Sequence, residues 1–316
     1  MTHRVGFVVF DGVTMLDVSG PAEVFGQASR LGHPYELVLI SPHGGSVTTS
    51  TGLALTATVR VADAGAVDTV VVAGGDRLAE GPLEDELLTV VRDLAARAGR
   101  VTSVCTGAFV LAELALLDGR RATTHWRHAG TLACRYPRVV VEPDTIHVRD
   151  GRYFTSAGIT AGIDLTLALV EDDHGADVAR HIARELVVFL QRPGGQSQFS
   201  AATEPPARDR PLRLLTEAVL ADPGGDHSLP AMAAATAVST RHLTRLFQAE
   251  FGTTPARWVE RIRVERAQRL LLDGHTVTSA ARHSGLGTDE TLRRAFARHL
   301  GTTPTDYRTR FSTTRP

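Results

Sequence analysis

Several features that many protein classes depend on are scarce or missing in this chain of 316 residues. Only two cysteines occur, Cys105 and Cys134, which are too few and too far apart for a disulfide framework or a zinc cluster. No apolar run approaches the ~20 residues that a membrane-spanning helix needs, so we expect no contact with a membrane. The amino-terminal residues lack the small-residue cleavage site of a signal peptide, which leads us to expect a cytoplasmic protein.

Lysine is also absent, and all 34 basic residues are arginine, a bias that we attribute to genomic base composition. The acidic residues balance these arginines unevenly. Residues 1–207 contain 17 Arg and 24 Asp or Glu, a net charge of -7, whereas residues 208–316 contain 17 Arg and 11 Asp or Glu, a net charge of +6. Because only the basic part attracts a polyanion, we expect the second part alone to meet nucleic acid.

The chain divides at residues 192–211, where four prolines and two glycines stand among small polar residues, a composition typical of a linker. Before the linker, residues 1–191 alternate short β-branched runs with helical patterns. This alternation predicts an α/β domain with a doubly wound parallel sheet, whose strands include 5–10, 35–41, 69–73 and 101–104. After the linker, residues 212–316 contain no convincing strand, and the sequence predicts an all-α domain.

An internal repeat with a constant offset of 49 residues is the strongest signal in the basic part of the chain. The segment LTRLF at residues 243–247 is matched by LRRAF at 292–296. The segment GTTP at 252–255 recurs at 301–304. Two copies at one offset indicate that one structural unit occurs twice.

Each copy is predicted to form a helix-turn-helix motif, the first at about residues 229–251 and the second at about 276–300. Ser239 and Thr288 are expected to cap the second helix of each copy. The apolar positions of those helices face inward, and arginines on the outer face can reach guanine in the major groove or neutralise phosphate. The outer faces are expected to carry Arg241, Thr244 and Arg245 in the first copy and Glu290, Thr291, Arg293 and Arg294 in the second.

A long helix is predicted between the two copies, at residues 256–272. It begins after Pro255 and ends at Asp273-Gly274, residue types that favour helix starts and stops. Such a helix can fix the spacing of the motifs, so that both recognition helices meet one face of the duplex about a turn apart.

Residues 212–311 resemble the AraC/XylS family of transcriptional regulators through Ser239, the two repeated segments, Ala267, Leu271 and Tyr307-Arg308. The resemblance implies base contacts by Arg241, Thr244 and Arg245, and by Glu290, Thr291 and Arg294. Asp289 and Glu290 are unusual at the start of a DNA-reading helix. They could accept hydrogen bonds from cytosine amino groups or simply favour the helix N-terminus, and the sequence leaves both interpretations open.

In the first part of the chain, a strand runs into Cys105 and a helix starts at once, which predicts a nucleophile elbow. The helix N-terminus favours a thiolate, so we expect a lowered pKa for the Cys105 thiol. Gly74 and Gly75 end another strand, and their backbone amides could face an oxyanion near the sulfur. His125 could orient a ligand or the thiol, or could be satisfied by backbone groups.

About residues 4–190 resemble the ThiJ/PfpI superfamily, which has the flavodoxin-like fold of class I glutamine amidotransferases. The matching segments are FDG at 10–12, Asp17-x-x-Gly20-Pro21, AGG at 73–75, CTG at 105–107, TTHW at 123–126 and SAGITAGID at 156–164. The resemblance implies that Cys105 stands at the position of the nucleophile and Asp17 at that of its acidic partner. Thr106 replaces the histidine of protease-like members, which argues against peptidase activity. It makes the set closer to isonitrile hydratases, which add water to an isocyanide carbon.

Joined in this order, the two parts resemble the GlxA group of AraC-type regulators, whose first domain is expected to dimerise and sense a small molecule. The sequence thus predicts a sequence-specific DNA-binding transcriptional regulator. Its expected partners are promoter DNA, an unknown small-molecule effector, a second copy of the chain and, for an activator, RNA polymerase. We expect no cofactor and no metal, since His125 and His128 are too few ligands for zinc.

Three interpretations of Cys105 stay open from the sequence. It could be an inert residue of a ligand pocket, a redox or electrophile sensor, or a catalytic cysteine of a hydratase or hydrolase, assisted by Asp17, Thr106 and His125. The residues expected to line the ligand site are Asp17, Gly74, Gly75, Cys105, Thr106, His125 and Gly158.

Overall fold

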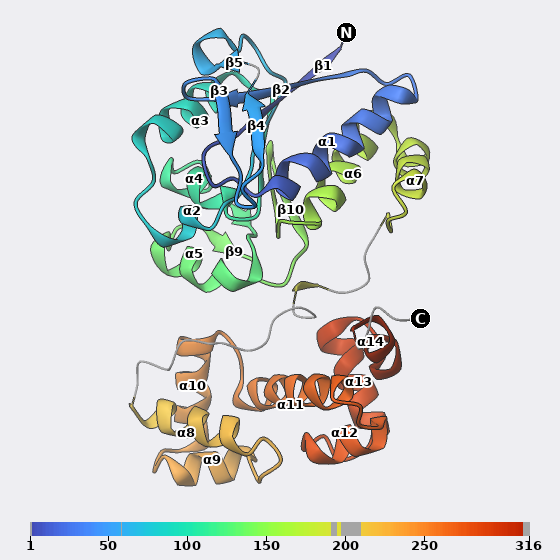
Figure 1. Cartoon of the computed structure of the whole chain (residues 1–316). Coiled ribbons are helices and arrows are strands. Elements are labelled where there is room, and N and C mark those ends of the chain that lie inside the picture. The colour runs from blue at the N-terminus through green and yellow to red at the C-terminus, as the bar shows by residue number, and fades with distance from the viewer. Residues whose placement is uncertain (1, 58, 191–194, 197–209, 312–316) are drawn as a thin grey trace. The chain divides into compact units, whose positions relative to one another are not determined.

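The computed structural model describes residues 2–57, 59–190, 195–196 and 210–311 (Figure 1). The chain divides into two compact units, residues 1–196 and 197–316. Most of the predicted linker at 192–211 lies outside the described residues. Its described part consists of Gly195 and Gln196, which belong to the first unit, and of residues 210–211, which begin the first helix of the second.

The first unit is built on a seven-stranded sheet with the order β10-β11-β7-β6-β1-β2-β5. All neighbouring strands are parallel except β10 and β11. These strands are β1 (His3–Val8), β2 (Tyr35–Ser41), β5 (Val59–Arg60), β6 (Thr69–Val72), β7 (Arg100–Val104), β10 (His147–Asp150) and β11 (Tyr153–Ser156). The pairs β3 (Gly45–Thr48) with β4 (Ala54–Ala57), and β8 (Arg121–Ala122) with β9 (Val140–Val141), form two small sheets.

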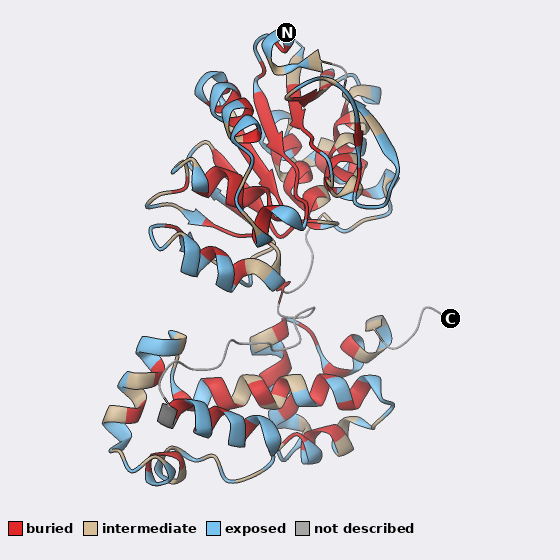
Figure 2. Cartoon of the chain, turned by 60° about the vertical axis from the view of Figure 1, so that its left-hand side comes forward, coloured by how far each residue is buried: buried red, intermediate tan, exposed pale blue. Residues whose placement is uncertain are grey.

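Helices cover both faces of the large sheet, because its central strands are apolar on both sides. All residues of β6 are buried, and so are all of β7 except Arg100. Figure 2 shows this buried layer running through the sheet. Helices α1, α6 and α7 pack together on one face, and α3 and α4 lie on the other (Figure 1). The predicted doubly wound parallel sheet is therefore confirmed.

The helical segments of the first unit surround the sheet in chain order. The α-helices are α1 (Met15–Arg30), α2 (Arg77–Glu80), α3 (Asp85–Arg97), α4 (Gly107–Glu113), α5 (Ala129–Arg135), α6 (Ala161–His174) and α7 (Ala176–Glu185). Two short 3-10 turns, η1 (Val61–Asp63) and η2 (Trp126–His128), precede β6 and α5.

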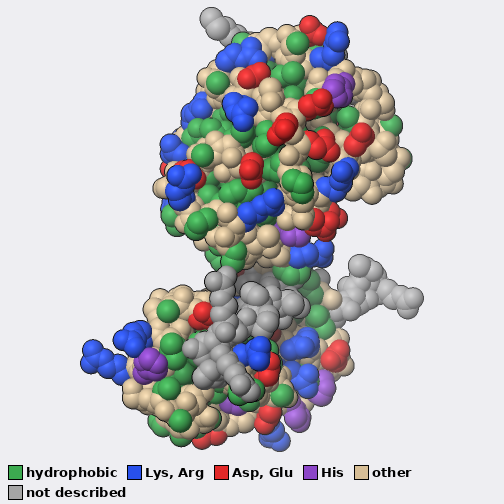
Figure 3. Space-filling view, turned by 90° about the vertical axis from the view of Figure 1, so that its left-hand side faces the viewer, with side chains coloured by type: hydrophobic (Ala, Val, Ile, Leu, Met, Phe, Trp, Pro, Cys, Tyr) green, Lys and Arg blue, Asp and Glu red, His purple; other side chains and the backbone are tan. Residues whose placement is uncertain are grey.

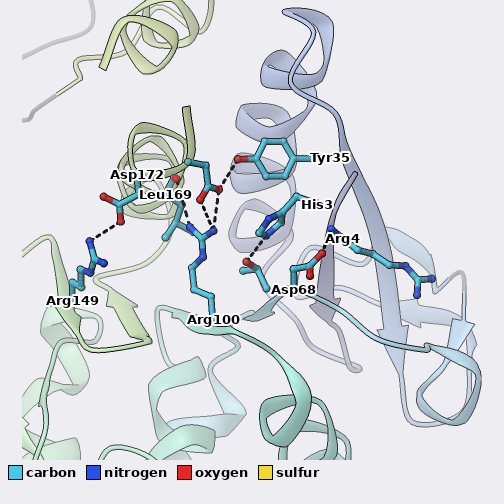
Figure 4. Close-up of polar contacts among 10 residues, drawn as sticks. His3, Arg4, Tyr35, Asp68, Arg100, Arg149, Leu169 and Asp172 are labelled. Carbon is cyan, nitrogen blue, oxygen red and sulfur yellow. Dashed lines mark hydrogen bonds and ion pairs between the residues drawn. The ribbon is translucent and has the colours of Figure 1, made fainter. Parts of the chain in front are cut away.

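Polar contacts tie the amino ends of the strands to the end of α6 (Figure 4). Arg100, at the start of β7, contacts both carboxylate oxygens of Asp173 at 2.7 and 2.9 Å. The Tyr35 hydroxyl, at the start of β2, donates to the same carboxylate at 2.7 Å. Beside them, Arg149 pairs with Asp172 at 2.7 Å. These contacts fix the amino edge of the sheet. The opposite, carboxyl edge is where open α/β sheets place their ligand sites.

The described part of the second unit is helical, with no strand, as the sequence predicts. Its helices are α8 (Arg210–Ala221), α9 (Leu229–Ala235), α10 (Thr240–Phe251), α11 (Pro255–Leu272), α12 (Val277–His283), α13 (Asp289–Leu300) and α14 (Pro304–Phe311). Two apolar cores lie along α11. Trp258 and Ile262 join the core of α8–α10, whereas Val264 and Leu271 join that of α12–α14. One continuous helix therefore carries both motifs.

The repeat extends into the packing of the two cores. The Phe247 ring lies 5.8 Å from the Trp258 ring, edge to face. At the same offset of 49 residues, the Phe296 ring lies 5.7 Å from the Tyr307 ring in the same arrangement. The motifs thus share an aromatic contact between the recognition helix and the helix that follows it.

Candidate DNA-binding surface and cysteine elbow

The first recognition helix, α10, is built as the sequence predicts. Ser239 caps it, and its hydroxyl accepts a hydrogen bond from the His242 amide at 3.2 Å. Leu243 and Phe247 are fully buried, which fixes the rotation of the helix. As a result Arg241 and Arg245 are exposed and Thr244 is partly exposed on the outer side.

The second recognition helix, α13, has the same construction. Thr288 caps it by accepting from the Thr291 amide at 3.2 Å, and Leu292 and Phe296 are fully buried. The residues left exposed on its outer side are Glu290, Thr291, Arg293 and Arg294. On the face of the second unit drawn in Figure 3, arginine side chains project from the surface.

The two acids at the start of α13 have separate partners. Asp289 accepts a hydrogen bond from the Thr278 hydroxyl at 2.9 Å, which joins α13 to α12 within the motif. Glu290 forms two ion pairs on its own helix, with Arg293 Nη1 at 2.7 Å and with Arg294 Nε at 2.8 Å. On α10, Arg245 Nη2 lies 2.9 Å from His242 Nδ1. Both recognition arginines are therefore held by an acceptor one turn earlier.

In the first unit, Cys105 occupies the predicted elbow between β7 and α4. Its φ of 58° lies in the left-handed region, which is costly for a residue other than glycine and recurs at functional turns. The thiol is nearly closed off, since Cys105 is only 6% exposed. Two glycines make room for the turn: a β-carbon on Gly158 would overlap Cys105, and one on Gly107 would overlap the Val72 carbonyl oxygen.

The carboxylate of Asp17, from the first turn of α1, lies beside Cys105, since a β-carbon on Gly74 would overlap both side chains. Its oxygens also accept from the amides of Ile159 at 2.7 Å and Gly74 at 3.1 Å. Burial raises the pKa of Asp17 to about 6, and the hydrogen bonds partly oppose this rise. Three segments far apart in the sequence therefore meet at this carboxylate.

The expected lowering of the Cys105 pKa is wrong. Burial raises the pKa of the thiol, and the negative charge of Asp17 raises it further, whereas hydrogen bonds with Thr106 only partly lower it. The helix N-terminus that favours a thiolate is therefore outweighed by desolvation and by a neighbouring carboxylate.

The expected oxyanion site at Gly74 and Gly75 is also not formed, because both amides have partners within the protein. The Gly74 amide donates to Asp17, and the Gly75 amide donates to the Thr106 hydroxyl at 2.9 Å. The Thr106 hydroxyl in turn donates to the Gly75 carbonyl at 2.8 Å. Thr106 thus ties the elbow to the end of β6, and no free amide of this glycine pair points at the sulfur.

His125 is half-buried at the start of η2, where its Nδ1 accepts from the Arg127 amide at 3.3 Å. Its ring lies 5.3 Å from Trp126 and 6.0 Å from His128. Burial, together with the charges of His128 and Arg127, lowers the pKa of His125. Within the described ranges, no cluster of three or more His, Cys, Asp or Glu side chains could hold a metal ion.

Two residues near the elbow were missed by sequence reasoning. The Thr124 hydroxyl donates to the Cys105 carbonyl at 2.8 Å, so it joins the segment before His125 to the elbow. Gln196 is 2% exposed, and its side-chain amide lies within hydrogen-bond distance of the Thr123 hydroxyl and of the Thr124 and Thr145 carbonyls. A glutamine in a linker of proline, glycine and small polar residues carries no periodic signal, so the sequence does not indicate its burial.

Comparisons with known proteins follow the same division into two parts. The model of the DJ-1/PfpI family matches residues 3–172, and that of a helix-turn-helix domain matches residues 232–310. Of the described helices, none combines the length and the apolar character that crossing a bilayer requires.

Three known proteins illustrate the similarity. The HTH-type transcriptional regulator GlxA of Rhizobium meliloti is 29% identical over 315 residues, which cover 98% of this chain and 96% of the relative. The isonitrile hydratase of Pseudomonas putida is 37% identical over 227 residues, 69% of this chain and 95% of the relative. A crystal structure of an AraC family transcriptional regulator from Pseudomonas putida superposes with a TM-score of 0.53 at 25% identity, covering 58% of this chain and 99% of that one.

Proposed function

Because the chain belongs to the DJ-1/PfpI family and carries a carboxyl-terminal helix-turn-helix domain of AraC type, we propose that it is a transcriptional regulator that binds specific duplex DNA. One observation carries the proposal: two equivalent helices, α10 and α13, each present an arginine on the outer face opposite a buried Leu and Phe. The similarity to a named regulator over nearly the whole chain supports it independently.

In this proposal the DNA contacts come from the two outer faces. Arg245 and Arg294 read base edges, and the other residues that line the duplex are Arg241, Thr244, Glu290, Thr291 and Arg293. Arginine suits this task because its planar fork can bind guanine O6 and N7 together. Each such base contact contributes roughly 1–3 kcal/mol of discrimination between bases.

The test is a mobility-shift titration of the full chain with a duplex selected from a random pool by the wild-type protein. Arg245→Ala and Arg294→Ala should each weaken binding to the selected duplex about tenfold or more, as expected for a lost base contact. The matched control is Arg180→Ala, which removes an exposed arginine from α7 of the first unit. If both recognition variants bind like the wild type, the assignment is wrong.

We propose further that the first unit binds a small-molecule effector at the carboxyl edge of its sheet, beside Cys105. The residues that we assign to this site are Asp17, Gly74, Gly75, Cys105, Thr106, His125 and Gly158. A regulator needs a ligand with different affinities for two states of the protein, and turnover is not required.

A second copy of the chain is the proposed partner of the first unit, and sedimentation equilibrium of the full chain tests this. RNA polymerase is a further partner if the protein activates transcription.

The hydratase alternative is not favoured. The isonitrile hydratase relative matches 69% of this chain, whereas the GlxA relative matches 98% and thus covers both units.

We also propose a cytoplasmic location. A transcriptional regulator works where chromosomal DNA is, which supports this location.

A further inference from the structure

The two recognition helices differ in charge at one equivalent position. The offset of 49 residues pairs Arg241 of α10 with Glu290 of α13. Glu290 bridges Arg293 and Arg294 through its two oxygens, at 2.7 and 2.8 Å. On α10 the recognition arginine, Arg245, contacts the imidazole of His242, whose counterpart at this offset is Thr291, so no carboxylate stands at the position of Glu290. The outer face of α10, with Arg241 and Arg245, is therefore more cationic than that of α13, where Glu290 offsets one of the two arginines Arg293 and Arg294.

We propose that Glu290 is a positioning residue that sets the specificity of α13, a role that rests on the DNA-binding function proposed above. Its contact with Arg294 uses Nε, so Glu290 does not engage the terminal nitrogens of the guanidinium, and these stay available for a paired contact with a base. Its negative charge also weakens attraction to phosphate, the source of non-specific affinity. Glu290 thus acts through Arg294 and makes no base contact itself.

The experiment compares the full chain with Glu290→Gln, which removes the charge and keeps the shape. Binding to the selected duplex and to a scrambled duplex of equal length is titrated at several KCl concentrations. The variant should bind the scrambled duplex roughly threefold or more tightly at low salt, with a log-log salt slope steeper by about 1, because released arginines contact phosphate. Its affinity ratio between the two duplexes should fall.

The matched control is Glu217→Gln, which removes an exposed glutamate paired with Arg213 on α8. An equal change in this control, an unchanged ratio in Glu290→Gln, or weaker binding to the selected duplex alone would each overturn the proposal. The last result would make Glu290 a base contact. If the wild type itself fails to discriminate between the duplexes, the proposed function fails first, so the two failures are distinguishable.

A second, independent observation concerns Gln196, the last described residue before the second unit. Its side-chain amide nitrogen lies 3.1 Å from the Thr123 hydroxyl, 2.9 Å from the Thr124 carbonyl and 3.1 Å from the Thr145 carbonyl. Its backbone amide donates to the Asp144 carbonyl at 2.8 Å. The preceding Gly195 lies so close to that carbonyl that a β-carbon would overlap it. This stretch is therefore built into the first unit.

Thr124 connects Gln196 to the elbow, because its carbonyl faces Gln196 while its hydroxyl donates to the Cys105 carbonyl at 2.8 Å. We infer that Gln196 couples the position of Cys105 to DNA binding by the second unit. A ligand that displaces Cys105 shifts Thr124, and a shifted Thr124 loosens Gln196. This route deepens the proposed effector site by assigning its output.

A double-mutant cycle on DNA affinity tests the route in the full chain. Thr124→Val removes the hydroxyl and keeps the carbonyl, and Gln196→Met keeps the volume of the side chain and removes its donor. Each variant should change the dissociation constant for the selected duplex severalfold, and the double variant should match Gln196→Met alone, since coupled residues are not additive. Thermal unfolding of each variant shows whether it folds.

The matched control is a second cycle in which Thr102→Val takes the place of Thr124→Val. Thr102→Val also removes a buried threonine hydroxyl, which donates to the Val70 carbonyl at 2.8 Å. Its effect should add independently to that of Gln196→Met. Additive effects of Thr124→Val and Gln196→Met, or unchanged DNA affinity in both single variants, would overturn the inference. Neither result affects the DNA-binding assignment, which the arginine variants test.

Discussion

Gly158 lies against Cys105 so closely that a β-carbon on the glycine would overlap the cysteine side chain. The glycine also has a φ of 94°, a conformation that residues with a side chain rarely adopt. It belongs to the loop whose next residue, Ile159, donates its amide to Asp17. The shape of the elbow site therefore depends on a residue without a side chain, 53 positions away from Cys105 in the sequence.

Gly158→Ala should destabilise the first unit through both backbone strain and overlap. The matched control is Gly175→Ala, because Gly175 has a similar φ of 86° and a β-carbon on it would meet nothing within 4 Å. The difference in free energy of unfolding between the two variants should be about 1–3 kcal/mol, the usual cost of overpacking. Urea denaturation measures it, and equal losses in both variants would contradict the close approach.

The raised pKa of Asp17 predicts a pH dependence of stability with a defined sign. The native protein holds this proton up to about pH 6, whereas the ordinary pKa is 3.8. Between these values folding takes up a proton, so the contribution of Asp17 to stability falls as the pH rises from about 4 to about 6. The difference in unfolding free energy between wild type and Asp17→Asn should fall by roughly 3 kcal/mol, at about 1.4 kcal/mol per pKa unit.

Chemical denaturation at several pH values measures this difference. Glu23→Gln is the matched control, since it removes an exposed carboxylate from the same helix. A difference between wild type and Asp17→Asn that stays constant or rises over the window would show that Asp17 is not desolvated in solution.

The two thiols should react at very different rates. Cys134 is exposed, whereas Cys105 is buried and its raised pKa disfavours the reactive thiolate. We expect iodoacetamide at neutral pH to alkylate Cys134 and to leave Cys105 largely unmodified in the native protein, as peptide mass spectrometry would show. Asp17→Asn should speed the reaction of Cys105, because loss of the neighbouring charge lowers the pKa of the thiol. Fast alkylation of wild-type Cys105 would instead favour a redox sensor.

The features that the sequence predicts correctly are those with a local signal. Runs of β-branched residues predict the central strands β1, β2, β6 and β7 to within about two residues. Ser239 and Thr288 predict the starts of both recognition helices, since a cap depends on residues only three positions apart. The short edge strand β10, which reads His-Val-Arg-Asp, has no such signal and is missed.

The features that the sequence misses depend on contacts between distant residues. The helix start after Cys105 is visible in the sequence, but the burial of the thiol and the approach of Asp17 are not, so the predicted direction of the pKa is wrong. The sequence predicts available amides at Gly74 and Gly75 because it does not show their acceptors, Asp17 and Thr106, which come from elsewhere in the fold. Gln196 lies among linker residues, and its acceptors are 51 to 73 positions away.

In the proposed complex α10 and α13 read two successive parts of one duplex, and footprinting of the selected duplex tests this arrangement most directly. Wild-type protein should protect two major-groove patches whose centres are about 10 base pairs apart, one helical turn. Arg245→Ala should lose protection at one patch and Arg294→Ala at the other. A single patch, or loss of the same patch in both variants, would contradict the account.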